Sequence, residues 1–102
     1  MTRVRLFVYG SLRRGHEHHV ELAGGAFLGA GVTAPSYRVV TVVGYPALVP
    51  GNAAVTGELY ALPSALLPEL DAFEGHRYRR RSVTLSDGTD AEAYFLAEAY
   101  VS

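Results

Sequence analysis

A glutamate at the end of a predicted helix is the residue of this chain best placed for acid–base chemistry. Glu74 follows an apolar helical repeat and directly precedes Gly75, so it falls in the last turn of the helix. The negative end of the helix dipole and the like charge of Asp71 both raise the pKa of its carboxyl group. A carboxyl group with a raised pKa suits a general base that works near neutral pH. A surface glutamate at a frayed helix end is the alternative interpretation.

A run of basic residues follows Glu74 along the chain. It consists of Arg77, Arg79, Arg80 and Arg81. A nearby cation lowers the pKa of a carboxyl group, so these arginines would act on the pKa of Glu74 in the opposite direction to the helix dipole. On a strand, Tyr78 and Arg80 share one face and Arg79 and Arg81 the other, so only one pair can face Glu74. With a net charge of −1 and no second basic cluster, a solvated strand face is preferred to an RNA-binding patch. No nucleic-acid partner is expected.

The turn after the first predicted strand is the second candidate site, and its residues are Tyr9, Gly10, Ser11 and Leu12. A glycine lets a ligand approach the main chain closely, and a concave set of backbone N–H groups binds carboxylates or phosphates. An ordinary strand-to-helix turn is the alternative. The chain has neither a Gly-Lys phosphate loop nor a G-x-G-x-x-G pattern, so nucleotide binding is unsupported.

Histidines gather at His16-Glu17-His18-His19, but the pattern is not H-E-x-x-H because position 20 is Val. We prefer a solvated helix start to a metal site, and we expect neither a metal nor a cofactor. The absence of Cys excludes disulfides, thiolate catalysis and Cys-based zinc sites, and the absence of Lys excludes a Schiff base.

The hydrophobic pattern predicts about seven short strands and two helices. The strands are expected at 3–9, 26–34, 37–43, 47–49, 53–60, 78–85 and 91–101, and the helices at 15–23 and 63–73. Leu66, Leu67, Leu70 and Phe73 mark the buried stripe of the second helix. Tyrosines on the strands, Tyr94 among them, are expected as half-buried sheet residues. The predicted fold class is α+β, a small mixed, mostly antiparallel, barrel-like sheet with about two flanking helices.

The 102 residues are expected to form a single domain, 1–102. The start of the chain does not resemble a signal peptide. The longest uncharged stretch, 39–57, is broken by glycines and prolines, so strands are expected there and no membrane span. We therefore expect a cytoplasmic protein.

Several short motifs, taken in order, resemble the gamma-glutamylcyclotransferase-like superfamily, and most closely its small members typified by gamma-glutamylamine cyclotransferase. The motifs are Tyr9-Gly10-Ser11-Leu12, Gly44-Tyr45-Pro46, Val49-Pro50-Gly51, Gly57-Glu58-Leu59-Tyr60, and Leu70 to Gly75 with Tyr78 and Arg80. The resemblance spans nearly the whole chain. The chain departs from the larger members in ending soon after the last predicted strand.

The resemblance implies an enzyme that releases 5-oxoproline from a gamma-glutamyl amine or peptide without metal or cofactor. The α-amine of the substrate would attack its own γ-carbonyl. Glu74 matches the essential glutamate of the family and would be the general base. Tyr9 to Leu12 match the loop that holds the α-carboxylate through main-chain N–H groups. Tyr78 would line the pocket, and Arg80 would pair with a carboxylate.

Two further hypotheses come from other functional classes. A non-catalytic binder of a small acidic metabolite would use the same loop without turnover. A protein- or RNA-interaction module would use the strand that carries Arg79 and Arg81. The oligomeric state and the identity of the leaving amine are not predicted.

Overall fold

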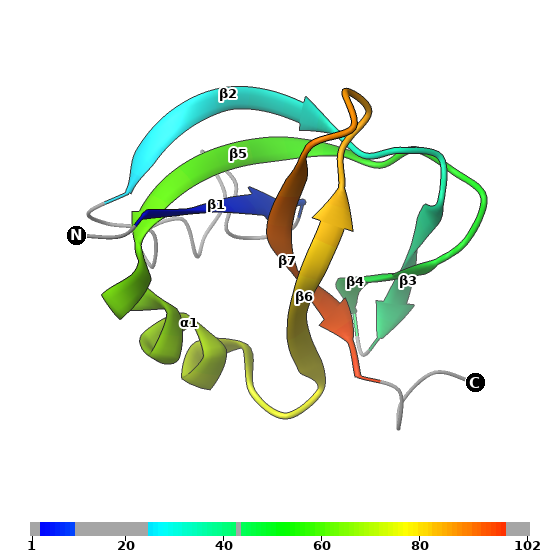
Figure 1. Ribbon diagram of the computed structural model, residues 1–102. Coiled ribbons are helices and arrows are strands. Elements are labelled where there is room, and N and C mark those ends of the chain that lie inside the picture. The colour runs from blue at the N-terminus through cyan, green and yellow to red at the C-terminus, as the bar shows by residue number, and fades with distance from the viewer. Residues whose placement is uncertain (1–2, 10–24, 43, 98–102) are drawn as a thin grey trace.

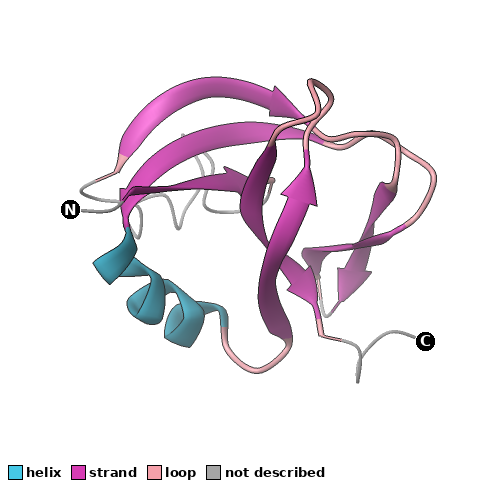
Figure 2. Cartoon of the chain, viewed as in Figure 1, coloured by secondary structure: helices cyan, strands magenta, loops and turns pink. Residues whose placement is uncertain are grey.

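One strongly curled sheet forms the body of the molecule (Figures 1 and 2). The computed structural model describes residues 3–9, 25–42 and 44–97. Within these residues the strands are β1 (Arg3–Val8), β2 (Ala26–Val32), β3 (Tyr37–Val42), β4 (Tyr45–Pro50), β5 (Thr56–Pro63), β6 (Tyr78–Thr84) and β7 (Asp90–Leu96). A 3₁₀ turn, Ser64–Leu66, leads into the helix α1 (Leu67–Glu74). The predicted helix at 15–23 lies outside the described residues.

The strand order confirms a mixed, mostly antiparallel sheet. The path is β2-β5-β1-β7-β4-β3, and β6 pairs with β7 off this path. The pairs β1–β5, β2–β5, β3–β4 and β6–β7 are antiparallel, whereas β1 and β4 run parallel to β7. β1 therefore has neighbours on both sides.

The prediction of a barrel-like sheet is wrong, because the sheet is open in the described part of the chain. Among the described residues, the end of β2 meets the β6–β7 hairpin at the single bridge between Thr33 and Leu85, which is made by the hydrogen bonds from Ala34 N to the Thr84 carbonyl and from Ser86 N to the Val32 carbonyl. Pro35 follows at once, and a proline cannot donate to a ladder. The edge strands β2 and β6 therefore meet at one point and do not form a continuous ladder of hydrogen bonds.

Two glycine turns, at Gly75 and Gly88, bound the part of the chain that follows Glu74 and forms β6. Gly75 ends α1 with φ 80°, a conformation that glycine adopts without a steric penalty. The hairpin between β6 and β7 turns at Gly88, φ 86°, with Asp87 accepting the backbone N–H of Thr89 at 2.9 Å. The chain thus brings α1 and β6 together on one side of the sheet (Figure 1).

The core divides between the two faces of the sheet. Leu6 and Val8 of β1 pack with Leu70 of α1 and with Tyr94, whereas Phe7 packs on the opposite side. The predicted helical stripe holds for Leu67 and Leu70, which are buried. It is wrong for Phe73, which is 38% exposed and is not part of the core clusters of the described residues.

Gly57 permits the closest backbone approach in β5. A Cβ atom at this position would lie 2.2 Å from the carbonyl oxygen of Val8, the last residue of β1. Backbone cannot move aside as a flexible side chain does, so we expect Gly57→Ala to lower the free energy of unfolding by about 1–3 kcal/mol. Urea denaturation followed by circular dichroism measures this change.

Gly51→Ala is the matched control. A Cβ atom there would lie 2.8 Å from Cγ and 3.0 Å from Cβ of Arg38, so the Arg38 side chain must rotate and its Cβ must shift slightly, but the three nearest atoms all belong to a side chain. We expect a smaller loss than for Gly57→Ala, about 1 kcal/mol or less. Equal destabilisation by the two alanines would show that the contact with Val8 does not limit the packing.

Candidate active site

Tyr9, the residue directly after β1, lies where β7 changes its neighbour from β1 to β4, and this place is called the division of the sheet. One edge of β7 pairs first with β1, at Glu92, and then with β4, at Phe95. The Tyr9 hydroxyl lies at this division, where it donates to the Tyr94 carbonyl and accepts the N–H of Leu48 at 2.9 Å. It satisfies two backbone groups for which no strand neighbour is placed, and buried backbone groups need partners. Burial raises the pKa of this phenol well above its ordinary value.

Glu74 lies beside this division. Its negative charge raises the pKa of both Tyr9 and Tyr78, so the three side chains are close enough to interact. Burial raises the pKa of the Glu74 carboxyl from 4.5 to about 7. Within the described residues no hydrogen bond or ion pair reaches this carboxylate. The raised pKa agrees in direction with the sequence prediction, but its cause is desolvation and not the helix dipole or Asp71.

Tyr78 begins β6 and is half-buried against the core. Its hydroxyl donates to the Pro46 carbonyl at 2.9 Å. Burial first, and then the charge of Glu74, raises its pKa, so the phenol stays neutral at physiological pH. Because its proton is already donated, the lone pairs of the Tyr78 oxygen remain available to accept a hydrogen bond from a ligand.

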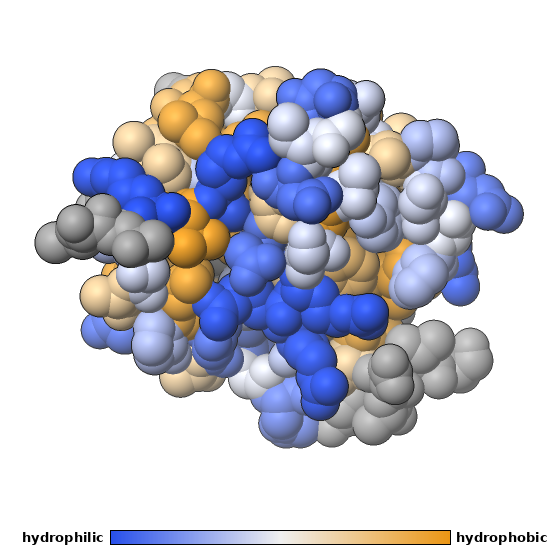
Figure 3. All heavy atoms as spheres, in the orientation of Figure 1, coloured by the Kyte–Doolittle hydropathy of each residue, from blue (hydrophilic) through white to orange (hydrophobic). Residues whose placement is uncertain are grey.

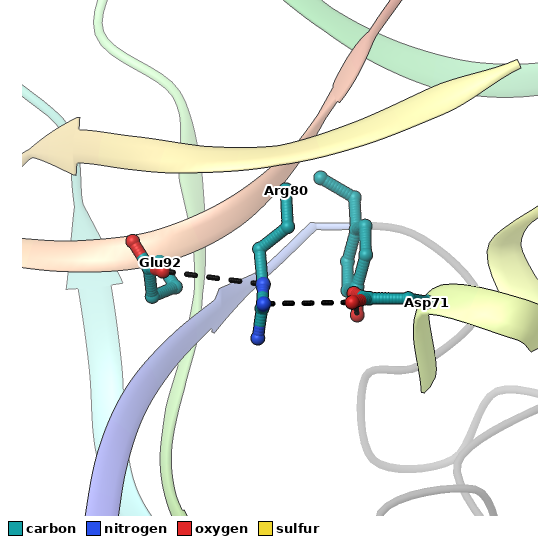
Figure 4. A network of polar contacts seen from close by, with 4 residues as sticks. Asp71, Arg80 and Glu92 are labelled. Atoms are coloured by element: carbon teal, nitrogen blue, oxygen red, sulfur yellow. Dashed lines mark hydrogen bonds and ion pairs between the residues drawn. The ribbon is translucent and has the colours of Figure 1, made fainter. Parts of the chain in front are cut away.

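A network of polar contacts joins α1 to β6 and β7 (Figure 4). Asp71 Oδ1 accepts the Tyr94 hydroxyl at 2.7 Å, and Asp71 Oδ2 lies 3.4 Å from Arg80 Nη2. Arg80 Nε lies 4.0 Å from Glu92 Oε1. The strand alternation is confirmed, since Arg80 turns inward with Tyr78 whereas Arg79 and Arg81 are exposed. The expected carboxylate pairing of Arg80 is also confirmed.

A pocket of about 290 Å³ opens between α1 and the β6–β7 pair. Its lining residues are Asp71, Tyr78, Arg79, Arg80 and Tyr94. Hydrophilic side chains gather over β6 on this face of the molecule (Figure 3). Tyr78 therefore belongs both to the pocket and to the surroundings of Glu74.

The structure brings together three of the six residues chosen from the sequence, namely Tyr9, Glu74 and Tyr78. Gly10, Ser11 and Leu12 lie outside the described residues, as does the His16–His19 cluster. Among the residues described, no three His, Asp or Glu side chains gather to hold a metal ion. In the same part of the chain no helix is long and apolar enough to cross a membrane.

Sequence reasoning missed two contributions. Tyr94 was expected only as a half-buried sheet residue, but it is 3% exposed and hydrogen bonds to Asp71. Tyr9 was chosen for the loop that it begins, whereas its hydroxyl joins two strands. Buried tyrosines usually find a partner for the hydroxyl, which is the one signal available in advance. The partners depend on pairings that are distant in sequence.

This chain is similar to known proteins over a region that includes Tyr9, Glu74 and Tyr78. A family described as "Gamma-glutamyl cyclotransferase, AIG2-like" matches residues 6–102. The gamma-glutamylcyclotransferase family protein YtfP of Escherichia coli K12 is 35% identical over 88 residues, 84% of this chain and 77% of that protein. The gamma-L-glutamyl-butirosin B gamma-glutamyl cyclotransferase of Niallia circulans is 35% identical over 69 residues, 68% of this chain and 44% of that protein.

A solved structure shares the fold. The crystal structure of an AIG2-like protein from Mus musculus superposes with a TM-score of 0.78 at 29% identity, covering 100% of this chain and 81% of the other. The match extends over every element described above, including the strands on either side of the division at Tyr9.

The raised pKa of Glu74 predicts a pH-dependent cost in stability. Between pH 4.5 and about 7 the folded state binds more protons than the unfolded state, so stability falls as pH rises through this window. Glu74→Gln removes the charge, and we expect its melting temperature to exceed that of the wild type by several degrees at pH 8 and to match it at pH 4. Thermal melts at both pH values measure the difference.

Glu69→Gln is the control, because Glu69 is exposed on the same helix. It should change the melting temperature little at either pH. If Glu74→Gln destabilises the protein at pH 8, the carboxylate makes favourable contacts and is not an uncompensated buried charge.

Proposed function

This chain belongs to the gamma-glutamyl cyclotransferase, AIG2-like family, and on that basis we propose that it is an enzyme releasing 5-oxoproline from a gamma-glutamyl amine or peptide. The observation that carries the proposal is the placement of Glu74. This carboxylate is half-buried and unpartnered among the described residues, and it stands beside Tyr9, where the chain enters the loop Gly10 to Leu12. The similarity to a protein named a gamma-glutamyl cyclotransferase, matched over 44% of its length, supports the same reaction class.

The proposed reaction closes a ring within the substrate. The α-amine attacks the γ-carbonyl carbon and forms the ring C–N bond of 5-oxoproline. The bond between the γ-carbonyl carbon and the leaving nitrogen breaks. The attacking nitrogen starts as an ammonium group and loses two protons in all, and the leaving nitrogen gains two and departs as an ammonium group, so no water, oxidant or cofactor is consumed.

Glu74 carries the proton between the two nitrogens in this proposal. An α-ammonium group has no lone pair, so a base must take its proton before attack. A pKa of about 7 lets Glu74 be ionised near neutral pH and still hold a proton well enough to return it to the leaving amine. An ordinary exposed glutamate would be a weaker base for the first step.

The loop and Tyr78 position the substrate for this attack. We assign the α-carboxylate to main-chain N–H groups of Gly10, Ser11 and Leu12, which follow directly from Tyr9. We assign the α-ammonium to a site between Glu74 and the oxygen of Tyr78, whose own proton is donated to Pro46. Holding both ends of the glutamyl group favours ring closure, since well-oriented intramolecular reactions gain up to about 7–11 kcal/mol.

Turnover and its loss in one variant test the proposal. We expect the wild type to release 5-oxoproline from at least one member of a panel of gamma-glutamyl amines and peptides, measured by liquid chromatography. Glu74→Gln should lower kcat by about a hundredfold or more, the range lost when a general base is removed. Glu69→Gln should keep the wild-type rate.

Two outcomes would contradict the proposal. Saturable binding of the panel compounds by calorimetry without turnover would favour the non-catalytic binder. Wild-type turnover by a folded Glu74→Gln variant would remove Glu74 from the role of base.

The pH dependence of kcat/KM is a separate prediction. Because Glu74 must be ionised to accept the ammonium proton, activity should rise with pH and level off above about 7. At pH 5 the ionised fraction, and hence kcat/KM, should be about a hundredfold below the plateau. An acid limb centred near 4.5 would show that the reacting carboxyl is not buried as Glu74 is.

A further inference from the structure

Tyr94 takes part in two hydrogen-bonded connections that meet beside Glu74. Its hydroxyl donates to Asp71 Oδ1 at 2.7 Å, and its backbone carbonyl accepts the Tyr9 hydroxyl. The side chain is buried, 3% exposed, and packs with Leu70 of α1 in the same core cluster. One residue of β7 therefore joins the helix that carries Glu74 to the point where the chain leaves β1.

Asp71 extends this connection to β6. Its second carboxylate oxygen lies 3.4 Å from Arg80, and Arg80 in turn lies 4.0 Å from Glu92 of β7 (Figure 4). Arg80 Nη1 is buried and has no hydrogen-bond partner in the described structure, so the guanidinium depends on these two carboxylates. Asp71 is thus held from β6 and from β7 at once.

The last turn of α1 needs such a contact. α1 has eight residues, and none of its last four, all of them described, is buried. Apolar packing therefore secures α1 at Leu67 and Leu70 but not in the turn that ends at Glu74. Asp71 lies three residues before Glu74, on nearly the same helical face, so holding the Asp71 side chain on the sheet also holds the backbone turn from which Glu74 projects.

We propose that Tyr94 and Asp71 are positioning residues, which hold the last turn of α1 on the sheet and thereby keep the Glu74 carboxylate desolvated and aimed at the substrate amine. This inference rests on the proposed function for its kinetic consequences, but its structural part concerns Glu74 alone. Tyr94 and Asp71 do not transfer protons in this proposal.

The groups around Glu74 fix the expected direction of a pH effect. The titratable groups that face it from the described elements are Tyr9 after β1, Tyr78 of β6 and Tyr94 of β7, all with raised pKa values and therefore neutral near pH 7. Asp71, Arg80 and Glu92 form the charged network beside them. If the turn loosens, water reaches Glu74 and its pKa falls toward the ordinary value.

Tyr94→Phe tests the proposal, because it removes one hydroxyl and keeps the ring. We expect kcat to fall about tenfold with KM within about twofold of the wild type, since a misplaced base affects the chemical step most. The acid limb of kcat/KM should move down by about half a pH unit or more. Asp71→Asn, which keeps an acceptor for Tyr94 but weakens the pair with Arg80, should move both quantities the same way and by less.

Tyr37→Phe is the matched control. The Tyr37 hydroxyl also makes one hydrogen bond, accepting the N–H of Thr84 at 2.9 Å, and its ring packs on Phe95 on the other face of the sheet. Both variants should lower the urea midpoint of unfolding, Tyr94→Phe by more because its hydroxyl bonds a carboxylate. Only Tyr94→Phe should alter kcat and the acid limb, and an equal effect of the two variants would overturn the proposal.

An NMR titration of the Glu74 side-chain carboxyl separates this inference from the proposed function. It needs no substrate, and Tyr94→Phe should lower the pKa of Glu74 in it, whereas Tyr37→Phe should not. An unchanged Glu74 pKa in both Tyr94→Phe and Asp71→Asn would overturn the positioning role. Absence of turnover in the wild type, with the pKa lowered as expected, would overturn the proposed function and leave the positioning role supported.

Discussion

The hydrogen bonds of the Tyr9 hydroxyl allow strand β7 to pair first with β1 and then with β4 without leaving the backbone groups between them unpaired. β7 pairs with β1 and then with β4 along one edge, and the division between these strands exposes the Tyr94 carbonyl and the Leu48 amide. An unpaired buried amide or carbonyl costs about 1–3 kcal/mol. By satisfying both groups, Tyr9 lets the chain leave the middle of the sheet at a fixed place.

Glu74 shows the opposite behaviour, since it is desolvated without compensation among the described residues. Its pKa of about 7 reflects burial, and a carboxylate in that state opposes folding above neutral pH. Proteins retain such local conflicts mainly where function requires them. The contrast with Asp71, three residues earlier, is informative because Asp71 has both a hydroxyl donor and a guanidinium partner. The same helical turn thus carries one satisfied and one unsatisfied carboxylate.

Sequence patterns predicted what local chemistry decides. The presence of seven strands, the helix end at Gly75, the turn at Gly88 and the opposite faces of Arg80 and its two arginine neighbours follow from alternation and turn residues, and the structure confirms them, although the strand predicted at 53–60 lies at Thr56–Pro63. Phe73 was wrong because helical periodicity gives a face but not the extent of the sheet that covers it. The partner of the Tyr9 hydroxyl lies 85 residues away, at a register that no local pattern specifies. The raised pKa of Glu74 was foreseen in direction, but its cause required knowledge of burial.

The arginines of β6 also show that sequence alternation predicts the face of a residue, whereas contacts with other elements decide its role. Alternation separates Arg80, which turns inward to Asp71, from Arg79 and Arg81, which are exposed. Arg81 lies 5.5 Å from the centroid of the Phe95 ring, so its stem and charge cover an aromatic side chain of the adjacent strand. Arg79 borders the pocket instead. A continuous charge run in the sequence therefore becomes three separate roles in the fold, because each strand position meets different neighbours.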